Sequence, residues 1–425
     1  MKVAFCTLGC KVNQYDTQTM LELFTAQGYE IVPFEEYADV YIINTCTVTG
    51  TGDTKSRQMA GRARRANPKA VIGLVGCYPQ RSPEEALGIG SVDFIAGTAQ
   101  RARIVDMVKS HIEGRGRRDL VSAFASGGYE ELGALAHEGR TRAYIKIQDG
   151  CENFCTYCAI PYARGPVRSR SLRAIEEEAL KLAQAGFQEI VITGVHIASF
   201  GKDTGDRPID AIRAVADCGV ARVRLGSVDP LLLDEAFCAA VSKIDNLCPH
   251  FHVSLQSGSD AVLKRMGRGY DTALYEENIR RLRRHYAVAG ITTDVMVGFP
   301  GESEQEFSES YSFVEHMAFS RIHVFSYSKR SGTPAASYGN QLEKSVKDVR
   351  NAQMTALGKR LKERYEAAKT GQKEWVLFET EKDGRSQGYT GDYVKVCCPG
   401  AHENELRYVE LLKYDGERQT GRLIV

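Results

Sequence analysis

Three cysteines, Cys151, Cys155 and Cys158, lie close together in the stretch DGCENFCTYCAIPYARGPVRSR, and we name them the tight trio. Cysteines grouped in this way in a reduced compartment favour a metal site over disulfides. Iron–sulfur clusters normally take four thiolates, so three thiolates leave one iron open to chelate a substrate. A zinc ion with a distant fourth ligand is the alternative, which the lack of a nearby histidine disfavours.

Three further cysteines, Cys10, Cys46 and Cys77, are far apart in the sequence but share one context, and we name them the dispersed trio. They follow the strand patterns VAFCTLG, VYIINT and VIGLVG. The carboxyl ends of parallel strands meet at one edge of a sheet, where ligands gather. These thiols are therefore expected to hold a second cluster, although each alone would more often be a small buried side chain.

Arginines lie near both trios. Arg164, Arg168 and Arg170 follow the tight trio, and Arg57 and Arg64 lie on a helix predicted in the N-terminal part. Guanidinium groups of this kind contact phosphates, so we expect these five to bind a polyanion such as RNA. For the two on the helix, the alternative is a solvated helix face.

The elements that position these residues form three predicted domains. Strands alternating with helices in residues 1–113 predict a parallel α/β domain. Residues 114–139, rich in Gly, Arg and Ala, are expected to be a linker. Six strand–helix units in residues 140–366 fit a partial (β/α)6 barrel. Period-two alternation with Gly-rich turns in residues 369–425 predicts a small antiparallel β-barrel.

Composition narrows the class of protein. The 425 residues have a formal net charge of +1, which excludes a globally basic nucleic-acid binder but leaves local patches open. No apolar run is long enough to cross a membrane, and the start of the chain lacks the features of a signal peptide. We therefore expect a cytoplasmic protein that does not bind membranes.

The motifs resemble one family. With Tyr157 before its last cysteine, CxxxCxxC is similar to the signature of radical S-adenosylmethionine enzymes. TLGCKVNQYDT, INTCTVT, CTYCAIPYARGPVRSR, SLQSGSD and VGFPGE, in this order, resemble the methylthiotransferase family over essentially the whole chain. GCKVNQYD further resembles the branch that acts on threonylcarbamoyladenosine in tRNA. The isopentenyladenosine branch usually has a Gln-Met-Asn variant there, and the ribosomal-protein branch a Pro-Lys-Asn variant.

The resemblance implies two 4Fe-4S clusters and S-adenosylmethionine as cofactors. The tight trio would hold the radical cluster, and the dispersed trio would hold an auxiliary cluster that carries the sulfur. One S-adenosylmethionine would methylate that sulfur, and a second would give a 5′-deoxyadenosyl radical. The radical would activate C2 of the adenine at position 37 of tRNA, next to the anticodon, where the methylthio group is inserted.

The resemblance also implies contacts and partners. S-adenosylmethionine would lie near Tyr157, Gly194, Ser227 and Gln256, and the C-terminal barrel would be a TRAM domain that grips RNA. Partners would be the tRNA anticodon loop, an electron donor such as flavodoxin or ferredoxin, and a sulfur donor, and we expect a monomer. The alternatives are a methylthiotransferase for isopentenyladenosine or for a ribosomal-protein aspartate, and a non-catalytic iron–sulfur RNA-binding module.

Overall fold

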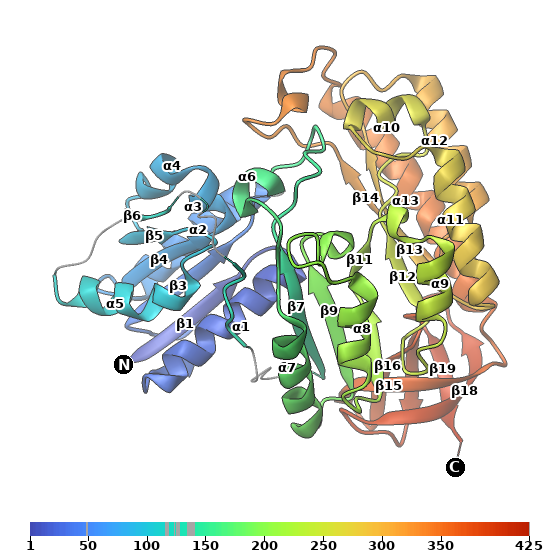
Figure 1. The fold of residues 1–425 in the computed structure, drawn as a ribbon, viewed down its shortest axis with the longest axis horizontal. Coiled ribbons are helices and arrows are strands. Elements are labelled where there is room, and N and C mark those ends of the chain that lie inside the picture. The colour runs from blue at the N-terminus through green and yellow to red at the C-terminus, as the bar shows by residue number, and fades with distance from the viewer. Residues whose placement is uncertain (48–49, 115–118, 123, 125–127, 134–140, 425) are drawn as a thin grey trace.

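The computed structural model describes residues 1–424 apart from 48–49, 115–118, 123, 125–127 and 134–140. An α/β domain, a larger central barrel and a small β-barrel follow one another along the chain (Figure 1). This architecture confirms the predicted fold class. Among the described helices, none is long and apolar enough to cross a membrane.

The N-terminal domain is one parallel sheet in the order β2-β1-β3-β4-β5-β6. Its strands are β1 (Lys2–Thr7), β2 (Glu30–Val32), β3 (Val40–Thr45), β4 (Val71–Gly76), β5 (Phe94–Ala96) and β6 (Asp119–Leu120). Its helices are α1 (Lys11–Ala26), α2 (Gly50–Ala66), α3 (Cys77–Arg81), α4 (Pro83–Leu87) and α5 (Ile104–Ile112), with the 3-10 turn η1 (Arg101–Arg103). Every residue of β3 and β4 is buried, as expected for a parallel sheet covered on both faces.

The sequence pattern did not predict the two edge strands of this sheet. β2 has three residues and β6 has two, too few to show a hydrophobic period. β6 lies inside the interval 114–139 and pairs with β5, so the expected linker contributes an edge strand to the sheet. Much of the rest of that interval lies outside the described residues.

The central domain contains all six predicted strands as a partial barrel. They are β7 (Arg142–Asp149), β9 (Glu189–Gly194), β10 (Arg222–Leu225) with β11 (Ser227–Val228), β12 (His250–Val253), β13 (Gly290–Val297) and β14 (Arg321–Ser326), and β8 (Arg168–Ser169) pairs antiparallel with β7. The third predicted strand is divided at Gly226 into β10 and β11. The strands therefore form two four-stranded sheets, β10-β9-β7-β8 and β11-β12-β13-β14.

Helices cover the outer face of these strands, as Figure 1 shows. They are α6 (Ile160–Arg164), α7 (Leu172–Gln184), α8 (Pro208–Ala216), α9 (Glu235–Val241), α10 (Asp260–Met266), α11 (Thr272–His285), α12 (Glu304–Met317) and α13 (Lys344–Ala367). Short 3-10 turns join them at η2 (Ile197–Ser199), η3 (Pro230–Leu232) and η4 (Pro334–Ser337).

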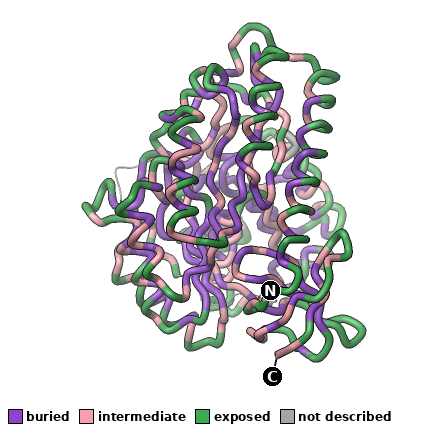
Figure 2. Tube along the Cα trace, turned by 90° about the vertical axis from the view of Figure 1, so that its right-hand side faces the viewer, coloured by how far each residue is buried: buried purple, intermediate pink, exposed green. Residues whose placement is uncertain are grey.

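The two faces of the barrel strands differ in polarity. Ile145 and Ile147 of β7 belong to the apolar core, and buried strands run through the centre of the molecule in Figure 2. Successive strand residues point to opposite faces, so Lys146 and Gln148 lie on the inner face. Both are buried polar side chains, and His252 continues the polar lining on β12. The barrel therefore encloses a polar lumen.

The C-terminal domain is a closed barrel in the order β15-β16-β17-β19-β18. Its strands are β15 (Lys373–Lys382), β16 (Arg385–Thr390), β17 (Lys395–Pro399), β18 (Leu406–Tyr414) and β19 (Gln419–Leu423). The pairs are antiparallel except for β17 with β19, which run parallel and close the barrel.

A buried carboxylate joins this small barrel to the central domain. Glu189, at the start of β9, is fully buried and forms ion pairs with Arg224 at 2.7 Å, Arg222 at 2.8 Å and Arg142 at 3.4 Å. Arg224 also donates to the carbonyl of Gly391 at 2.7 Å, and Arg222 donates to carbonyls beside it. One carboxylate thus orients the guanidinium groups that bind the C-terminal domain.

We expect this carboxylate to make stability depend on pH. Burial, the largest influence, would raise the pKa of Glu189, but Arg224, Arg222 and Arg142 outweigh it and lower the pKa from 4.5 to about 2. A lowered folded-state pKa adds stability above the unfolded value, and this contribution of about 3 kcal/mol is lost as pH falls from 4.5 towards 2.

Glu189→Gln should therefore lower the free energy of unfolding at neutral pH by about 3 kcal/mol, measured by urea denaturation. The difference from wild type should shrink as pH is lowered towards 3. Glu177→Gln removes an exposed ion pair with Arg173 and serves as the control, with little effect expected. A difference that stays constant over this pH range would contradict the assignment.

Candidate active site between two cysteine trios

The dispersed trio meets at one edge of the N-terminal sheet. Cys10 caps the start of α1, Cys46 directly follows β3, and Cys77 is the first residue of α3 after β4. β1, β3 and β4 are neighbours in the sheet, so their carboxyl ends bring the three thiols together. At Gly9, where φ is +104°, a Cβ would lie 2.9 Å from the Cys46 Sγ, so glycine lets the Cys10 turn approach Cys46.

Electrostatics also place these three thiols in one site. The pKa of the Cys77 thiol is raised to about 12, first by burial and also by the neighbouring Cys10 and Cys46 thiols. The Arg164 guanidinium acts in the opposite direction and hydrogen-bonds to Cys77. A thiolate here needs positive charge, which Arg164, the N-terminus of α1 and a bound metal would supply.

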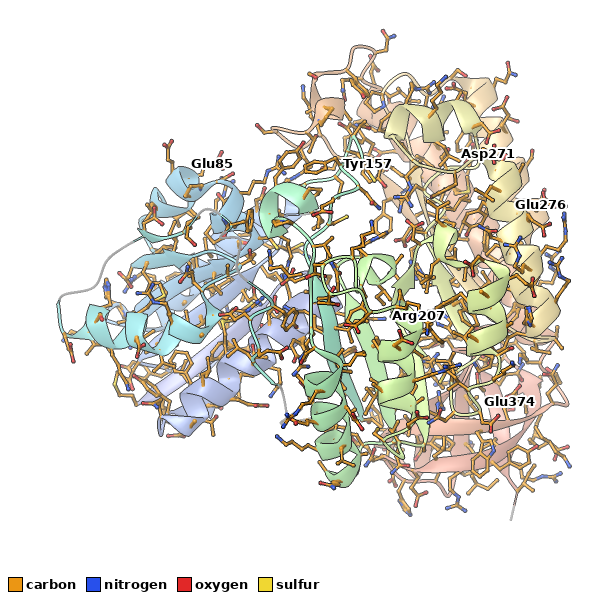
Figure 3. All side chains as sticks on the ribbon, in the orientation of Figure 1. Glu85, Tyr157, Arg207, Asp271, Glu276 and Glu374 are labelled. Carbon is orange, nitrogen blue, oxygen red and sulfur yellow. The ribbon has the colours of Figure 1, made fainter. Side chains whose placement is uncertain are left out.

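The tight trio lies in the loop between β7 and α6, at the carboxyl end of the barrel. The pKa of Cys158 is raised to about 12, first by burial and then by the other two thiols of the trio, and the backbone N–H of Ile160 acts in the opposite direction. The backbone N–H of Cys158 donates to the Cys155 carbonyl at 2.9 Å. Tyr157 stacks edge-on with Phe299 of the VGFPGE motif, 6.5 Å between ring centroids. Figure 3 labels Tyr157 at the end of the barrel opposite to Glu374.

Each trio supplies three thiols, the donor type that holds a 4Fe-4S cluster. All six cysteines are free thiols. Within the part of the chain that the structure describes, no group of three or more His, Cys, Asp or Glu side chains is arranged to hold one metal ion. The thiolates of a 4Fe-4S cluster bind separate irons, so they are spread more widely than the ligands of one ion.

Arg164 links the two trios through a buried charge network. It lies on α6, just after the tight trio, and forms ion pairs with Asp149 at 3.1 Å and Asp16 at 2.9 Å. It also donates to the Asn13 Oδ1 at 2.6 Å. Burial, the largest influence, would raise the pKa of Asp149, but Arg164 and Lys146 outweigh it and hold that pKa well below its ordinary value.

The short helix α3 sets the separation of the trios. It has five residues and begins with Cys77, and at about 1.5 Å per residue it spans only about 7 Å to Arg81. The pKa of Arg81 is lowered by burial and then by Arg330, while Tyr162 and Cys158 act in the opposite direction. One end of α3 therefore touches the dispersed trio, and the other end lies near the tight trio.

The predicted RNA-binding arginines after the tight trio are placed differently from the expectation. Arg164 and Arg170 are 1% and 3% exposed, and Arg170 forms ion pairs with Glu178 at 2.5 Å and Glu131 at 2.8 Å. Arg168 is half-buried and donates to the Arg164 carbonyl at 3.1 Å. The sequence showed their charge but not the buried carboxylates that hold two of them in structural positions.

The two arginines on α2 differ from each other. Arg64 forms an ion pair with Asp93 at 2.6 Å and donates to backbone carbonyls, so it ties α2 to the sheet. Arg57 is exposed, with its guanidinium 5.7 Å from the Tyr78 ring centroid. RNA contact by Arg57 and by Arg168 stays a prediction that fits their positions.

The residues expected near S-adenosylmethionine lie at the carboxyl ends of the barrel strands. Gly194 ends β9, Ser227 follows β10, and Gln256 follows β12. A Cβ on Gly194 would lie 3.3 Å from the Gln148 Oε1, so this turn fits closely against β7. Gln256 has a φ of 71°, which is uncommon for a residue with a side chain. Contact with S-adenosylmethionine stays a prediction for all of them.

Sequence reasoning missed a polar group beside the tight trio. Arg268 donates to the Cys155 Sγ at 3.3 Å and to the Asp229 Oδ2 at 3.2 Å. Asp229 also lies 3.2 Å from the His196 Nε2, which contacts Asn153 at 3.2 Å. His196 and Asp229 each lie just after a barrel strand, and this position is the sequence signal that could have identified them. Arg268 follows α10 and has no such signal.

Two exposed aromatic side chains stand beside the same trio. Phe154 and Tyr162 are 54% and 40% exposed, and their rings meet edge-on with centroids 5.7 Å apart. Phe154 has a φ of 45°, a strained conformation for a large residue that often marks functional sites. Tyr162 lines an open recess of about 750 Å³ with residues of the 329–337 segment. Arg81 lies 6.0 Å from the Tyr162 ring centroid.

Comparison with known folds agrees with this architecture. Family models match residues 2–97, described as "Uncharacterized protein family UPF0004", and residues 145–314, described as the Radical SAM superfamily. The radical S-adenosylmethionine methyltransferase TsrM from Kitasatospora setae, solved with cobalamin and a 4Fe-4S cluster, matches with a TM-score of 0.60. The match has 14% identity and covers 79% of this chain and 74% of that chain, so it shows the fold alone.

Relatives of higher identity define the family. Threonylcarbamoyladenosine tRNA methylthiotransferase MtaB of Bacillus subtilis (strain 168) is 41% identical, over 99% of this chain and 96% of that protein. The protein of the same name from Aquifex aeolicus (strain VF5) is 39% identical, over 82% and 86%. A tRNA-2-methylthio-N(6)-dimethylallyladenosine synthase of Pelotomaculum thermopropionicum is 33% identical, over 91% and 88%. The chain belongs to the radical S-adenosylmethionine methylthiotransferase family.

Proposed function

We propose that this protein adds a methylthio group to C2 of threonylcarbamoyladenosine at position 37 of tRNA. The observation that carries the proposal is the 41% identity, over nearly the full length of both chains, to a relative named for this activity. The relative named for dimethylallyladenosine is less similar, at 33%. The two adjacent trios support the same chemistry, because they provide two separate sets of three thiolates.

We propose that the tight trio holds a 4Fe-4S cluster that binds S-adenosylmethionine, and that the dispersed trio holds a second cluster. When bound, these groups supply one-electron reduction, a methyl group and sulfur. The protein contributes position and charge. Arg164 offsets negative charge at the dispersed trio, and Arg268 donates a hydrogen bond to Cys155. The short helix α3 keeps the two sites adjacent.

We propose that the aromatic pair Phe154 and Tyr162 stacks an unpaired base of the anticodon loop that flanks the substrate nucleotide. A base modified at C2 must leave its stack, and tRNA loops offer unstacked bases at low cost. Exposed aromatic rings provide stacking surfaces for such a base. The recess beside Tyr162 is open to solvent, so an unstacked base of the loop can reach this ring.

Further partners follow from this proposal. The C-terminal barrel would act as the TRAM domain that grips the tRNA near the anticodon loop. Reduction and sulfur insertion would need an electron donor such as flavodoxin or ferredoxin and a separate sulfur donor, in the cytoplasm. We propose that the N-terminal domain spans residues 1–113, the central domain 140–366 and the C-terminal domain 369–425.

Two cysteine variants test the proposed function. Cys155→Ser should lower 5′-deoxyadenosine formation to background, because it removes a ligand of the radical cluster. Cys46→Ser should keep 5′-deoxyadenosine formation and insert no methylthio group. Each variant should lose close to half of the about eight irons of the reconstituted protein. The measurements are nucleoside mass spectrometry of treated tRNA and iron analysis after anaerobic reconstitution.

The same assay decides between the candidate substrates. Wild-type protein should modify tRNA that carries threonylcarbamoyladenosine and leave tRNA that carries dimethylallyladenosine unmodified. The opposite preference would assign the protein to the other tRNA branch. A fully active Cys46→Ser variant would show that the dispersed trio is not the sulfur site.

The hydrogen bond from Arg268 to Cys155 should tune the reduction potential of the radical cluster. A cationic donor stabilises the more negative reduced state and so raises the potential. Arg268→Leu should shift the potential to a more negative value without loss of iron, measured by redox titration with electron paramagnetic resonance. Arg265→Leu, which breaks the side-chain ion pair with Glu306 and keeps the backbone contact of Arg265 with Thr156, is the control. An unchanged potential would mean that this contact does not tune the cluster.

Stacking on Tyr162 should contribute to substrate affinity. Tyr162→Ala should weaken binding of an anticodon stem-loop by about fivefold to a hundredfold, the usual range for one base on one aromatic ring. Tyr162→Phe should bind nearly as well as wild type, because the ring remains. Tyr37→Ala removes another exposed tyrosine, in the loop before β3, and should have no effect. Equal binding by Tyr162→Ala and wild type would contradict the proposed platform.

A further inference from the structure

A polar cavity of about 240 Å³ lies in the barrel lumen near the amino ends of β12, β13 and β14, where the end of α13 and residues 392–394 of the C-terminal domain also line it. Its lining includes His250 and His252 of β12, Thr292 of β13, and Arg321 and His323 of β14. Lys11 also lines it and is the first residue of α1. Because Lys11 directly follows Cys10, the cavity reaches from the lumen towards the dispersed trio.

The carboxylates of this cavity form ion pairs, whereas, among the described residues, Lys11 and Arg321 have only longer-range electrostatic interactions, with Glu189 and Glu366 respectively. Glu366 pairs with Lys362 at 3.1 Å, and Asp392 pairs with Lys369 at 2.6 Å. Across the residues that the structure describes, the side chains of Lys11 and Arg321 form no hydrogen bond or ion pair. The cavity therefore has two cations available for an anionic ligand.

The electrostatic potential inside the cavity is also positive. His250 is 5% exposed, and its Nδ1 has no hydrogen-bond partner among the described residues. Its pKa lies well below the ordinary value, first because of burial and then because Arg224, His252 and Lys11 repel a proton. His252 lies 3.3 Å from Asp294, which also acts on His323, and the carboxylates of Glu366 and Asp392 line the same cavity. The cavity remains electropositive and would stabilise a negative charge.

The cavity is open to a large substrate along the β14 edge. β14 ends its sheet, and Arg321, His323 and Phe325 alternate on one face of it. His323 is exposed and Phe325 is 49% exposed, so within the described part of the chain this face of the edge strand is accessible to solvent. A substituent on a base can therefore enter the lumen from the side.

We propose that this cavity binds the carboxylate of the threonylcarbamoyl group, with Lys11 and Arg321 as the residues that determine substrate specificity. This inference rests on the proposed function and deepens it. The threonyl part of the substituent ends in a carboxylate and carries a hydroxyl group. Arginine can bind a carboxylate through two parallel hydrogen bonds, and Lys11 adds a second charge. The hydroxyl meets histidine and threonine side chains in the same cavity.

The cavity also discriminates against the other tRNA substrate. A dimethylallyl group is a hydrocarbon, and placing it here would desolvate Lys11 and Arg321 without giving them a partner. Sites built for a polar group reject an apolar analogue strongly for this reason.

The test compares two anticodon stem-loops that carry threonylcarbamoyladenosine, one with the free carboxylate and one with its neutral methyl ester. Binding to the reconstituted full-length protein is measured by fluorescence anisotropy. Wild type should prefer the acid by about tenfold to a hundredfold, the range for a hydrogen bond to a charged group. Lys11→Met should lose most of this preference, and Lys11→Arg should keep it. Lys69→Met removes an exposed lysine before β4 and should behave as wild type.

Three results would overturn the inference. Equal binding of acid and ester by wild type would do so without any variant. An equal loss for acid and ester in Lys11→Met would indicate a phosphate contact instead. An unchanged acid preference in both Lys11→Met and Arg321→Met would place the carboxylate elsewhere. Methylthiolation of the acid stem-loop by wild type is scored separately, so failure of the proposed function is distinguished from failure of this site.

Discussion

The ion pairs of Arg164 with Asp149 and Asp16 are the constraint on which the rest of the site depends. Arg164 belongs to the central domain and Asp16 to the N-terminal helix α1, so the pair joins two domains. Burying charges costs several kcal/mol per ion unless partners and hydrogen bonds compensate. Lys146 and Arg101 complete the compensation with contacts to Asp16 at 2.5 and 2.8 Å. Such a network is satisfied in only one relative orientation of the domains.

The orientation fixed in this way explains the geometry of the two trios. Each trio is positioned by its own sheet, through turns at the carboxyl ends of parallel strands. Neither sheet alone determines where the other set of thiols lies. Arg164 contacts the carboxylates of Asp149 and Asp16 as well as Cys77. It therefore holds the two sheets in a fixed position relative to each other. Charge balance and domain docking are thus provided by the same side chain.

Much of the fold could be predicted from the sequence because it depends on the hydrophobic periodicity of short segments. Buried strands such as β3 and β4 are continuous apolar runs, and the cysteines after them mark strand ends. The edge strands β2 and β6 were not readable, because two or three residues carry no period. The division of the third barrel strand at Gly226 was also missed, since one glycine within a strand pattern has several meanings.

A residue of the functional site could be predicted from the sequence only where a reactive side-chain type also lies at a recognisable position, such as the end of a strand. The six cysteines have both the side-chain type and the position. Arg268 does not, because only tertiary structure brings it to Cys155, 113 positions away. Arg164 was recognised as a charge near a cluster, but its burial depends on Asp149 and Asp16, whose proximity no local pattern reveals. Charged residues are therefore harder to assign from sequence than thiols, since their roles depend on their partners.

The incomplete barrel has a consequence for the size of molecule that can be processed. A closed ring of eight strands is reached only through the mouth of the ring, which suits metabolites. Here β14 is an edge strand, so the ring of strands stays open on one side. A polymer can place one residue at such an open side while its remaining length stays outside, and it can leave by the same route without being threaded.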